Sequence, residues 1–448
     1  MNTRKPRVLN GFRDYVPDQM RLRLRVIEIF RNVFERHGFE PLDTPAIEYL
    51  EVLTGKAGEN EKLMYQFTDH GGREVGLRYD LTVPLARFIA MHQNEVVLPF
   101  KRYHIAPLWR AERPQRGRFR EFWQCDADIV GSPSMLADAE AISVLSEALD
   151  GVGLSEATVL INHRKLLESL ALLAGVPAER ASGVFRAIDK LAKVGPDGVL
   201  KELEAAGIDR DAGHRILELV TKSGEPKELL DEAERRLVGV PGADEAVQQL
   251  RELLTFLRAL GVSESAYRID LSLARGIDYY TGPVYEAVVQ EQNIGSVAGA
   301  GRYDDLVGTF LGRPVPATGM SLGFERIIEV VRELDLLSVD AAVAQVFVVA
   351  LPQTLEDAGH IATELRRHEI RVDQSILINR GLGDQLRHAD RRGIPIAVIP
   401  GEAELSRGNV ALKDLKSGEQ REVSIPLLPE EIHRMLAALS DCSISAEE

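Results

Sequence analysis

Residues 109–131, WRAERPQRGRFREFWQCDADIVG, place arginines at positions 110, 113, 116, 118 and 120 around Gly117, among several aromatic side chains. Short apolar runs stand on both sides of these arginines, and they predict two strands joined by a loop. Arg110 and Glu112 are one residue apart on the first predicted strand, so their side chains point to the same face. Phe122 lies on the returning strand.

This residue set has two interpretations. An arginine can bind a phosphate through two parallel hydrogen bonds, and it suits that task better than lysine. The carboxylate of Glu112 can accept a hydrogen bond from an adenine amino group, and the Phe122 ring can stack on the base. The stretch therefore favours a nucleotide site. The alternative is an exposed hairpin with ordinary ion pairs, which are common on strands.

Length, composition and charge limit the class of protein. The chain has 448 residues, enough for two or three domains, and 45% of them are apolar, which predicts a large core. The formal net charge of −15 argues against nucleic-acid binding over the whole surface but leaves room for local basic patches. Cys125 and Cys442 are far apart, which predicts a reducing compartment, no disulfide framework and no protein-bound metal.

No apolar run approaches the roughly eighteen residues that a membrane helix needs. The first residues, MNTRKPRVLNGFRDYVP, are basic but lack the apolar core of a secretory signal. We therefore expect a cytoplasmic protein without a membrane segment.

The composition and the hydrophobic spacing of the sequence change several times along the chain. Residues 1–162 mix helical and strand patterns, whereas residues 163–262 are rich in Ala, Leu, Glu, Lys and Arg at helical spacing. Strand patterns resume over 263–334, and 335–345 is a linker candidate. Residues 346–448 alternate strands and helices, which predicts an α/β domain with a largely parallel sheet.

Individual elements follow from the same patterns. Val26, Phe30 and Phe34 lie on one face of a predicted helix over residues 17–37, which Gly38 ends. The other predicted elements are strands in VGLRYDLTV (75–83), FKRYHIAPLW (100–109) and VLIN (159–162), a helix over 135–149, and a strand-to-helix passage over 321–334.

Three further stretches carry groups suited to ligand binding. LARGIDYYTG (273–282) holds two adjacent tyrosines, which on a strand would point to opposite faces, one to the core and one to a ligand. GSVAGAGRYDDLVG (295–308) has glycines that let the backbone approach a ligand or another strand, and it favours a tight β-turn beside a binding floor. ATGMSLGFERII (317–328) places Arg326 at a strand-to-helix junction, opposite Arg110. The alternative there is a helix start with Glu325 near the N-terminal dipole.

In this order the stretches resemble the class II aminoacyl-tRNA synthetases, and among them the histidyl-tRNA synthetase family. WRAE with Phe122 is similar to motif 2, TPAIEYLE with Pro45 to motif 1, and GFER to motif 3. LARGIDYYTG and GAGRYDDLVG are similar to the two signature peptides of the family. The chain departs from some bacterial members, which carry Glu where it has Asp80 and Asp128, and its glycine peptide reads AGAGRYD rather than three glycines in a row.

The resemblance implies a fold and an activity. The fold is an α+β catalytic domain, an antiparallel sheet with helices, interrupted by a helical insertion and followed by a C-terminal α/β anticodon-binding domain. The activity is activation of L-histidine by ATP with Mg²⁺ to histidyl-adenylate and pyrophosphate, then transfer to the 3′ end of histidine tRNA. Because motif 1 lies at a dimer interface in this class, a homodimer is also implied.

The resemblance also implies roles for individual residues. Two arginines would act in catalysis at the α-phosphate: Arg110 and Arg275. Five residues would bind ATP: Arg110, Glu112, Arg118, Phe122 and Arg326. Seven would bind histidine: Asp80, Thr82, Gln124, Asp128, Arg275, Tyr279 and Tyr280. Three would meet the tRNA acceptor stem: Arg113, Gln115 and Arg116.

The implied histidine site makes chemical sense. Neutral imidazole has one N–H donor and one bare nitrogen acceptor. A carboxylate can accept from the first and a phenol can donate to the second, and such a pocket rejects analogues that lack either group. Two rivals remain: a non-catalytic paralogue resembling regulatory subunits of a histidine-biosynthetic phosphoribosyltransferase, and an RNA-binding module without the reaction. The closing domain and the retained arginines argue against the first rival.

The closing domain would bind the anticodon. Between residues 345 and 425 there are 11 Lys and Arg against 12 Asp and Glu, a net charge of 11 − 12 = −1, compared with −15 for the chain. Arg387, Arg391 and Arg392 are spaced to share one predicted helix. The alternative for each of them is a solvated helix face.

Overall fold

The computed structural model describes residues 5–54, 62–115, 117–177, 181–274, 279–289 and 295–444. The chain divides into two compact units, one of Met1–Tyr15 and Leu22–Leu337 and one of Val16–Arg21 and Ser338–Glu448. Within the described part of the chain, no helix is both long and apolar enough to cross a membrane.

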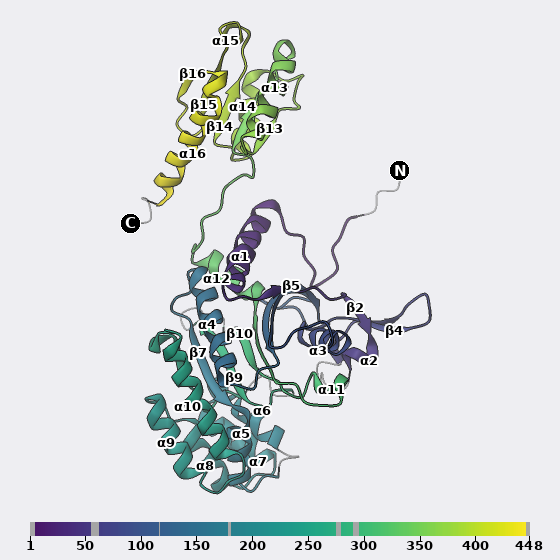
Figure 1. The fold of residues 1–448 in the computed structure, drawn as a ribbon, viewed down its shortest axis with the longest axis vertical. Helices are drawn as coiled ribbons and strands as arrows, with labels where there is room; N and C mark the ends of the chain where they lie inside the picture. The colour runs from purple at the N-terminus through teal and green to yellow at the C-terminus, as the bar shows by residue number, and fades with distance from the viewer. Residues whose placement is uncertain are drawn as a thin grey trace. The chain divides into compact units, whose positions relative to one another are not determined.

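An eight-stranded sheet forms the centre of the larger unit (Figure 1). Its strands, in spatial order, are β1 (Glu40–Pro41), β5 (Phe100–Trp109), β6 (Glu121–Val130), β11 (Ala317–Leu322), β10 (Gly295–Arg302), β9 (Pro283–Val289), β7 (Thr158–His163) and β8 (Tyr267–Ile269). The six middle strands pair antiparallel, and only the short edge strands β1 and β8 pair parallel to their neighbours. This confirms the antiparallel sheet. The same unit contains a separate three-stranded sheet, whose strands in spatial order are β2 (Ile47–Tyr49), β4 (Glu74–Leu77) and β3 (Gln66–Thr68).

Six helices outside the 163–262 segment belong to the described part of the larger unit: α1 (Pro17–Arg36), α2 (Leu50–Leu53), α3 (Thr82–Met91), α4 (Met135–Gly151), α11 (Gly308–Leu311) and α12 (Phe324–Glu333). Of these, α4 and α12 pack on the large sheet. Val26, Phe30 and Phe34 of α1 are buried, as predicted. α4 contacts β6 and β11, and α12 contacts β6 and β10. Both helices therefore pack on β6, the strand formed by the second half of the 109–131 stretch.

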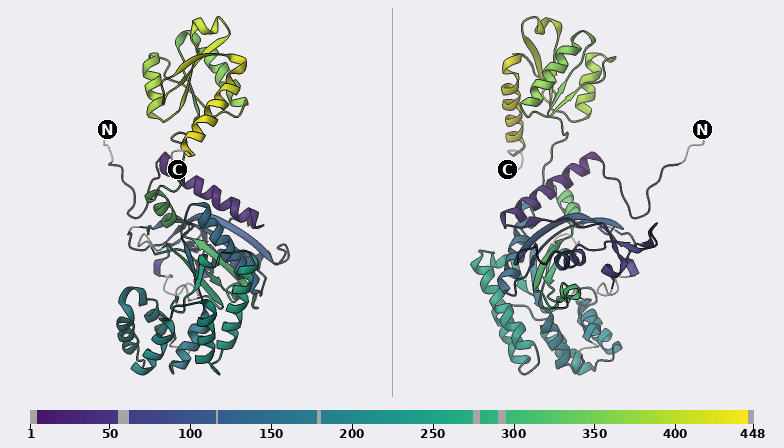
Figure 2. Two further views of the ribbon diagram at one scale, coloured as in Figure 1. Left: turned by 90° about the vertical axis from the view of Figure 1, so that its left-hand side faces the viewer. Right: turned by 45° about the vertical axis from the view of Figure 1, so that its right-hand side comes forward.

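The segment 163–262 is helical, as its composition predicts. It forms α5 (Arg164–Leu173), α6 (Ala181–Ile188), α7 (Leu191–Ala205), α8 (Arg210–Val220), α9 (Pro226–Arg236) and α10 (Ala243–Ala259). These helices gather at one end of the larger unit in Figures 1 and 2, and α10 packs against α4 and α5.

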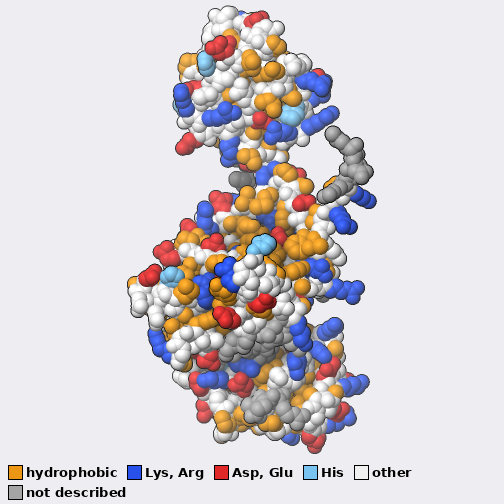
Figure 3. All heavy atoms as spheres, turned by 90° about the vertical axis from the view of Figure 1, so that its right-hand side faces the viewer, with side chains coloured by type: hydrophobic (Ala, Val, Ile, Leu, Met, Phe, Trp, Pro, Cys, Tyr) orange, Lys and Arg blue, Asp and Glu red, His pale blue; other side chains and the backbone are white. Residues whose placement is uncertain are grey.

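The smaller unit is an α/β fold around a five-stranded sheet. The spatial order is β13 (Val372–Gln374), β12 (Val346–Val348), β14 (Ile396–Ile399), β15 (Asn409–Asp414) and β16 (Gln420–Ser424). Its helices are α13 (Leu355–Arg367), α14 (Leu382–Arg391), α15 (Glu402–Leu405) and α16 (Leu428–Ile444). Lys, Arg, Asp and Glu side chains are interspersed on its visible face in Figure 3.

The expectation of a largely parallel sheet in this unit was wrong. β12 pairs parallel with β13 and β14, but β14 with β15 and β15 with β16 pair antiparallel. The connection between β15 and β16 is a tight turn in which Gly418 N donates to Asp414 O at 3.0 Å. Such a short connection can join only antiparallel strands, since a parallel crossover needs a dozen or more residues.

Two further expectations were wrong in the larger unit. VGLRYDLTV is not one strand, because β4 ends at Leu77 and α3 begins at Thr82. The Asp80 carboxylate accepts from Val83 N at 3.1 Å, which satisfies a backbone donor at the helix start. Arg110 and Glu112 do not lie on a strand either, because β5 ends at Trp109.

The glycine-rich stretch forms strand β10, not the expected tight β-turn. Gly299 pairs with Ser321 on one side and Glu286 on the other. The glycines are needed because other groups come close: a Cβ on Gly301 would lie 3.0 Å from the Tyr280 ring. A Cβ on Gly319, its partner on β11, would lie 2.0 Å from Asp128 Oδ1. The expected binding floor is thus a strand whose small residues make room for side chains of the site.

Candidate active site

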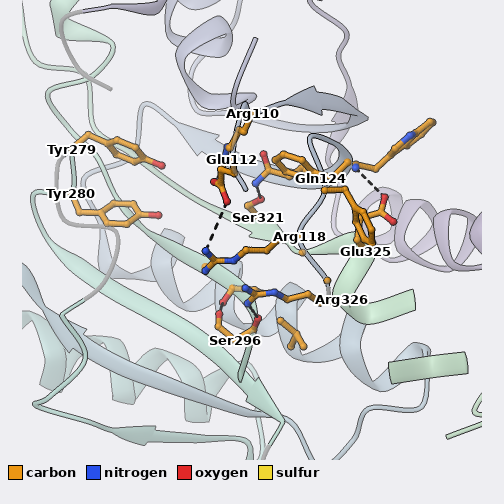
Figure 4. Close-up of a pocket in the computed structure, with 18 residues that line it drawn as sticks. Arg110, Glu112, Arg118, Gln124, Tyr279, Tyr280, Ser296, Ser321, Glu325 and Arg326 are labelled. Atoms are coloured by element: carbon orange, nitrogen blue, oxygen red, sulfur yellow. Dashed lines mark hydrogen bonds and ion pairs between the residues drawn. The ribbon is translucent and has the colours of Figure 1, made fainter. Parts of the chain in front are cut away.

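A cavity with a volume of about 400 Å³ lies over the middle strands of the large sheet (Figure 4). Its walls come from the segment between β5 and β6, the start of β6, β10, β11 and the start of α12. The predicted residues that line it are Arg110, Glu112, Arg118, Phe122, Gln124, Tyr279, Tyr280 and Arg326. Residues far apart in the sequence, from the stretch at 109–131 to the helix at 324–333, therefore share one cavity.

Arg110 is held at the rim of the cavity by two contacts. Its Nε donates to the carbonyl oxygen of Tyr79 at 2.9 Å, and its guanidinium carbon lies 5.1 Å from the centroid of the Phe122 ring. The second contact has the geometry of a cation–π interaction. Glu112 lies opposite Arg118, with 3.8 Å between Oε2 and Nη1. The backbone bond leaves the other guanidinium nitrogens of Arg110 able to reach an anion.

Arg326 lies at the other end of the cavity. It is the third residue of α12, and its Nη1 donates to the carbonyl oxygen of Ser296 on β10. Figure 4 shows Arg110 in the upper part of the view and Arg326 in the lower part, with Arg118 between them. This arrangement offers a row of positive charge to an extended anion.

Glu325, next to Arg326, forms a buried junction that the sequence did not indicate. Its two carboxylate oxygens each accept from Arg23 of α1 at 2.8 Å. It also accepts from Arg13 Nη2 at 2.6 Å and from the backbone N–H of Trp123 at 3.2 Å. Arg23 is only 1% exposed. The junction ties the N-terminal segment and the start of β6 to the helix that carries Arg326.

A cluster of carboxyl groups lies beneath the cavity, around one buried arginine. Arg102 Nη2 lies 2.7 Å from Asp128 Oδ2 and donates to Leu81 O at 3.1 Å, and Tyr303 donates its hydroxyl to Asp128 Oδ1. Asp80 and Asp126 are the other acids of the cluster. Burial raises the pKa of Asp80 to about 6 and that of Asp126 to about 7, and it also raises the pKa of Asp128, against the attraction of Arg102.

The cluster carries more negative than positive charge when its acids are ionised, which suits a cationic ligand group. Asp126 was not among the predicted residues. The available signal was its spacing, because residues 124, 126 and 128 point to the same face of a strand. Asp80, Thr82 and Asp128 are buried and are not part of the described cavity wall.

Gln124 bridges the cavity and the buried layer. Its Nε2 donates to Ser321 Oγ at 2.5 Å. Its Oε1 is buried and has no hydrogen-bond partner among the residues that the structure describes. A buried carbonyl oxygen without a donor is costly, so this atom is a natural acceptor for a bound ligand.

Tyr279 and Tyr280 do not point to opposite faces, contrary to expectation. Both line the cavity, and their ring centroids lie 4.8 Å apart in an edge-to-face contact. Figure 4 shows the two rings pointing the same way into the cavity. The alternation rule does not apply because these residues precede β9 and are not part of a strand. Burial raises the pKa of both phenols, so both remain hydrogen-bond donors at neutral pH.

The remaining predicted residues lie elsewhere or outside the description. Arg113 and Gln115 are exposed, and the backbones of Gln115 and Arg118 pair with each other at 2.9 and 3.0 Å across a tight turn. Arg116 and Arg275 lie outside the described residues. The structure shows, within its described ranges, no group of three or more His, Cys, Asp or Glu side chains that could hold a metal ion.

Comparisons with known proteins agree with this geometry. Residues 11–327 match the family model for histidyl-tRNA synthetase, and residues 345–435 match that for an anticodon binding domain. A histidine–tRNA ligase from Aeropyrum pernix is 45% identical over 434 residues, 94% of this chain and 96% of that protein. One from Rhodopirellula baltica is 40% identical with the same coverage.

Solved structures give the same result. The crystal structure of histidyl-tRNA synthetase from Nostoc sp. PCC 7120 has a TM-score of 0.86 at 34% identity, covering 97% of this chain and 100% of that one. A Bacillus halodurans C structure described as an ATP phosphoribosyltransferase regulatory subunit/histidyl-tRNA synthetase has a TM-score of 0.72 at 23% identity, a likeness of fold alone. On the match of its sequence over nearly its full length, the chain belongs to the histidyl-tRNA synthetase family.

Proposed function

We propose that the chain is a histidine–tRNA ligase, which activates L-histidine with ATP and transfers it to the 3′ end of histidine tRNA. The observation that carries this proposal is the single cavity of about 400 Å³. It combines arginines at opposite ends, an aromatic ring beside Arg110, and the unpaired Gln124 oxygen above a cluster of acids. Those are the groups needed for a triphosphate, a base and an amino acid with a cationic amino group.

In the activation step, the histidine carboxylate attacks the α-phosphorus of ATP and pyrophosphate leaves. Arg110 and Arg275 stabilise the charge that builds on the α-phosphate oxygens. Arg326 and Arg118 hold the outer phosphates, while Glu112 and Phe122 position the adenine. ATP enters as its Mg²⁺ complex, since a divalent cation offsets the triphosphate charge. The protein contributes positioning and electrostatic stabilisation rather than a covalent intermediate.

Histidine binds with its amino group over the acids. Asp80, Thr82 and Gln124 accept hydrogen bonds from the ammonium group. Asp128 keeps lone pairs for the imidazole N–H beyond those that Arg102 and Tyr303 use, because an ionised carboxylate has about four acceptor positions. Tyr280 donates to the bare imidazole nitrogen, and Tyr279 packs against it.

In the transfer step, a ribose hydroxyl at the tRNA 3′ end attacks the carbonyl carbon of the adenylate and AMP leaves. Arg113, Gln115 and Arg116 meet the acceptor stem. The smaller unit reads the anticodon, with Arg387, Arg391 and Arg392 on or next to α14 as candidate contacts. We further propose a homodimer located in the cytoplasm, on the basis of the family resemblance.

Isotope exchange between ATP and pyrophosphate tests the proposal. We expect exchange that depends on histidine, occurs without tRNA and is supported by no other standard amino acid. Charging of total tRNA with each amino acid in turn is the companion measurement. The fold is shared with a protein described as a regulatory subunit, so tRNA or effector binding without histidine-dependent exchange would favour a non-catalytic role.

Gln115 is expected to read the first base pair of the tRNA. It is exposed at the turn, outside the wall of the cavity, and its amide can bond a base edge while a neighbouring arginine contacts guanine or a phosphate. Histidine tRNA in this family carries an extra guanosine at its 5′ end. Gln115→Ala should leave pyrophosphate exchange unchanged, lower charging of intact tRNA roughly tenfold, and lose its preference over tRNA lacking that guanosine.

The decisive comparison is charging of both tRNAs by wild type and variant, with exchange as the internal control. A variant that still discriminates between the two tRNAs as wild type does would exclude Gln115 as the reader and leave the turn as a solvated loop.

A further inference from the structure

The Gln124 side chain can bind a ligand in only one orientation of its amide. An amide has a donor nitrogen at one end and an acceptor oxygen at the other, and its orientation is set by its hydrogen-bond partners. Here Nε2 donates to Ser321 Oγ at 2.5 Å, and Oε1 is the buried end without a described partner. An ammonium group needs an acceptor, so only this orientation can receive it.

Ser321 is in turn held by Asp126. The two residues are directly opposed in the pairing of β6 with β11, so their side chains lie on the same face of the sheet. Hydrogen bonding from Ser321 works to lower the pKa of the Asp126 carboxyl, as expected for a hydroxyl that donates to a carboxylate. Asp126 is 2% exposed. A hydroxyl has a single proton, so while Ser321 donates it to Asp126 its oxygen can only accept from its other neighbour. The other neighbour is Gln124, which must therefore present its NH₂ end to Ser321.

We propose that Asp126 and Ser321 are positioning residues, whose hydrogen-bond relay turns the Gln124 carbonyl oxygen towards the α-ammonium group of the amino-acid substrate. This proposal rests on the proposed function and deepens it, because it adds two residues that act through Gln124. The contribution of the relay is orientation: it removes the alternative in which the amide presents a donor to a cation.

The ionisation of Asp126 determines whether the relay holds. The charged and titratable groups around it are Asp80, Arg102, His104, Asp128, Tyr279 and Tyr280. Burial raises the pKa of Asp126 to about 7, and burial lowers the pKa of His104 to about 3, which keeps that imidazole neutral near pH 7. Above pH 7 the carboxylate accepts from Ser321. As pH falls through 7, protonated Asp126 can itself donate, and the Ser321 proton is then free to turn to the amide oxygen.

Ligands with and without an amino group separate orientation from general damage. In Ser321→Ala, we expect the KM for histidine in pyrophosphate exchange to rise about tenfold, the effect of one hydrogen bond, while the KM for ATP stays unchanged. The inhibition constant of 3-(imidazol-4-yl)propanoate, which lacks the amino group, should also stay unchanged. Ser321→Thr retains a hydroxyl and should recover most of the histidine affinity.

The pH dependence gives a second readout. In Asp126→Asn the side chain cannot ionise, so only wild type loses the relay as pH falls. The ratio of wild-type to variant kcat/KM for histidine should therefore decrease from pH 8 to pH 6. Titration of histidine itself affects both proteins equally and cancels in the ratio. If Ser321→Ala weakened the binding of histidine and of 3-(imidazol-4-yl)propanoate equally, Ser321 would have only a structural role. If neither ligand bound more weakly, the relay would be overturned. Absence of histidine-dependent exchange in wild type would instead refute the proposed function.

Discussion

Replacing Arg110 with alanine is expected to lower the rate of histidine-dependent pyrophosphate exchange roughly 10²- to 10³-fold, the effect of losing one preorganised charge-stabilising donor. The structure explains why the side chain is preorganised. Its Nε is fixed on Tyr79 O at 2.9 Å and its guanidinium lies over Phe122 at 5.1 Å. Since the gain is made in the transition state, histidine affinity should change much less than the rate.

Arg113 provides the matched control for this measurement. It lies three residues further on in the same arginine-rich stretch, is exposed, and is not part of the described cavity wall. Arg113→Ala removes the same charge and should leave exchange unchanged. Equal losses in the two variants would mean that the general positive charge of the loop matters, and an unchanged rate in Arg110→Ala would refute its role at the α-phosphate.

The sequence predicted the parts of this site that depend on local pattern. The helix with Val26, Phe30 and Phe34 and the strand with Phe122 follow from periodicities of 3.6 and 2. Family resemblance predicted that Arg110 and Arg326 belong to one site, and both residues line the same cavity.

Contacts between distant segments could not be predicted in this way. The helical patterns of residues 17–36 and 324–333 do not indicate that Arg23 and Glu325 form an ion pair, because the pairing depends on how α1 packs beside α12. The same limit applies to Ser321 and Asp126, which only the register of β6 with β11 brings together. The two tyrosines were placed wrongly for a different reason: Tyr279 and Tyr280 precede β9 and are not part of a strand, so strand alternation does not apply.

Arg302 shows how a signature peptide can carry a residue whose work is structural. It ends β10, is 2% exposed and does not line the described cavity. Its Nε donates to Asp138 Oδ2 at 3.1 Å, and its Nη1 and Nη2 donate to the carbonyls of Ser132 and Ser134 at 3.0 and 3.1 Å. It therefore ties the start of α4 to the strand that floors the cavity, and Asp138 is 0% exposed.

Arg302→Met is accordingly expected to destabilise the catalytic unit by about 3–5 kcal/mol, because it leaves Asp138 buried without its cation. Burial already raises the pKa of Asp138, against the attraction of Arg302. Without Arg302 the pKa of Asp138 in the folded variant should rise further, so Asp138 binds a proton on folding over a wider range of pH. The free energy of unfolding of the variant should therefore decrease as pH rises, because the folded state must then either hold a proton on Asp138 or bury its unpaired charge. Urea unfolding of the catalytic unit at several pH values measures both effects.

The double variant Arg302→Met with Asp138→Leu separates a broken ion pair from a loss of packing. Removing both charges leaves no buried charge, and apolar replacements of buried ion pairs are often close to neutral. The double variant should therefore be more stable than Arg302→Met alone, with the two substitutions strongly non-additive. If it is as unstable as the sum of the single variants, the arginine acts through its packing and its bonds to the Ser132 and Ser134 carbonyls, and the buried charge of Asp138 does not dominate.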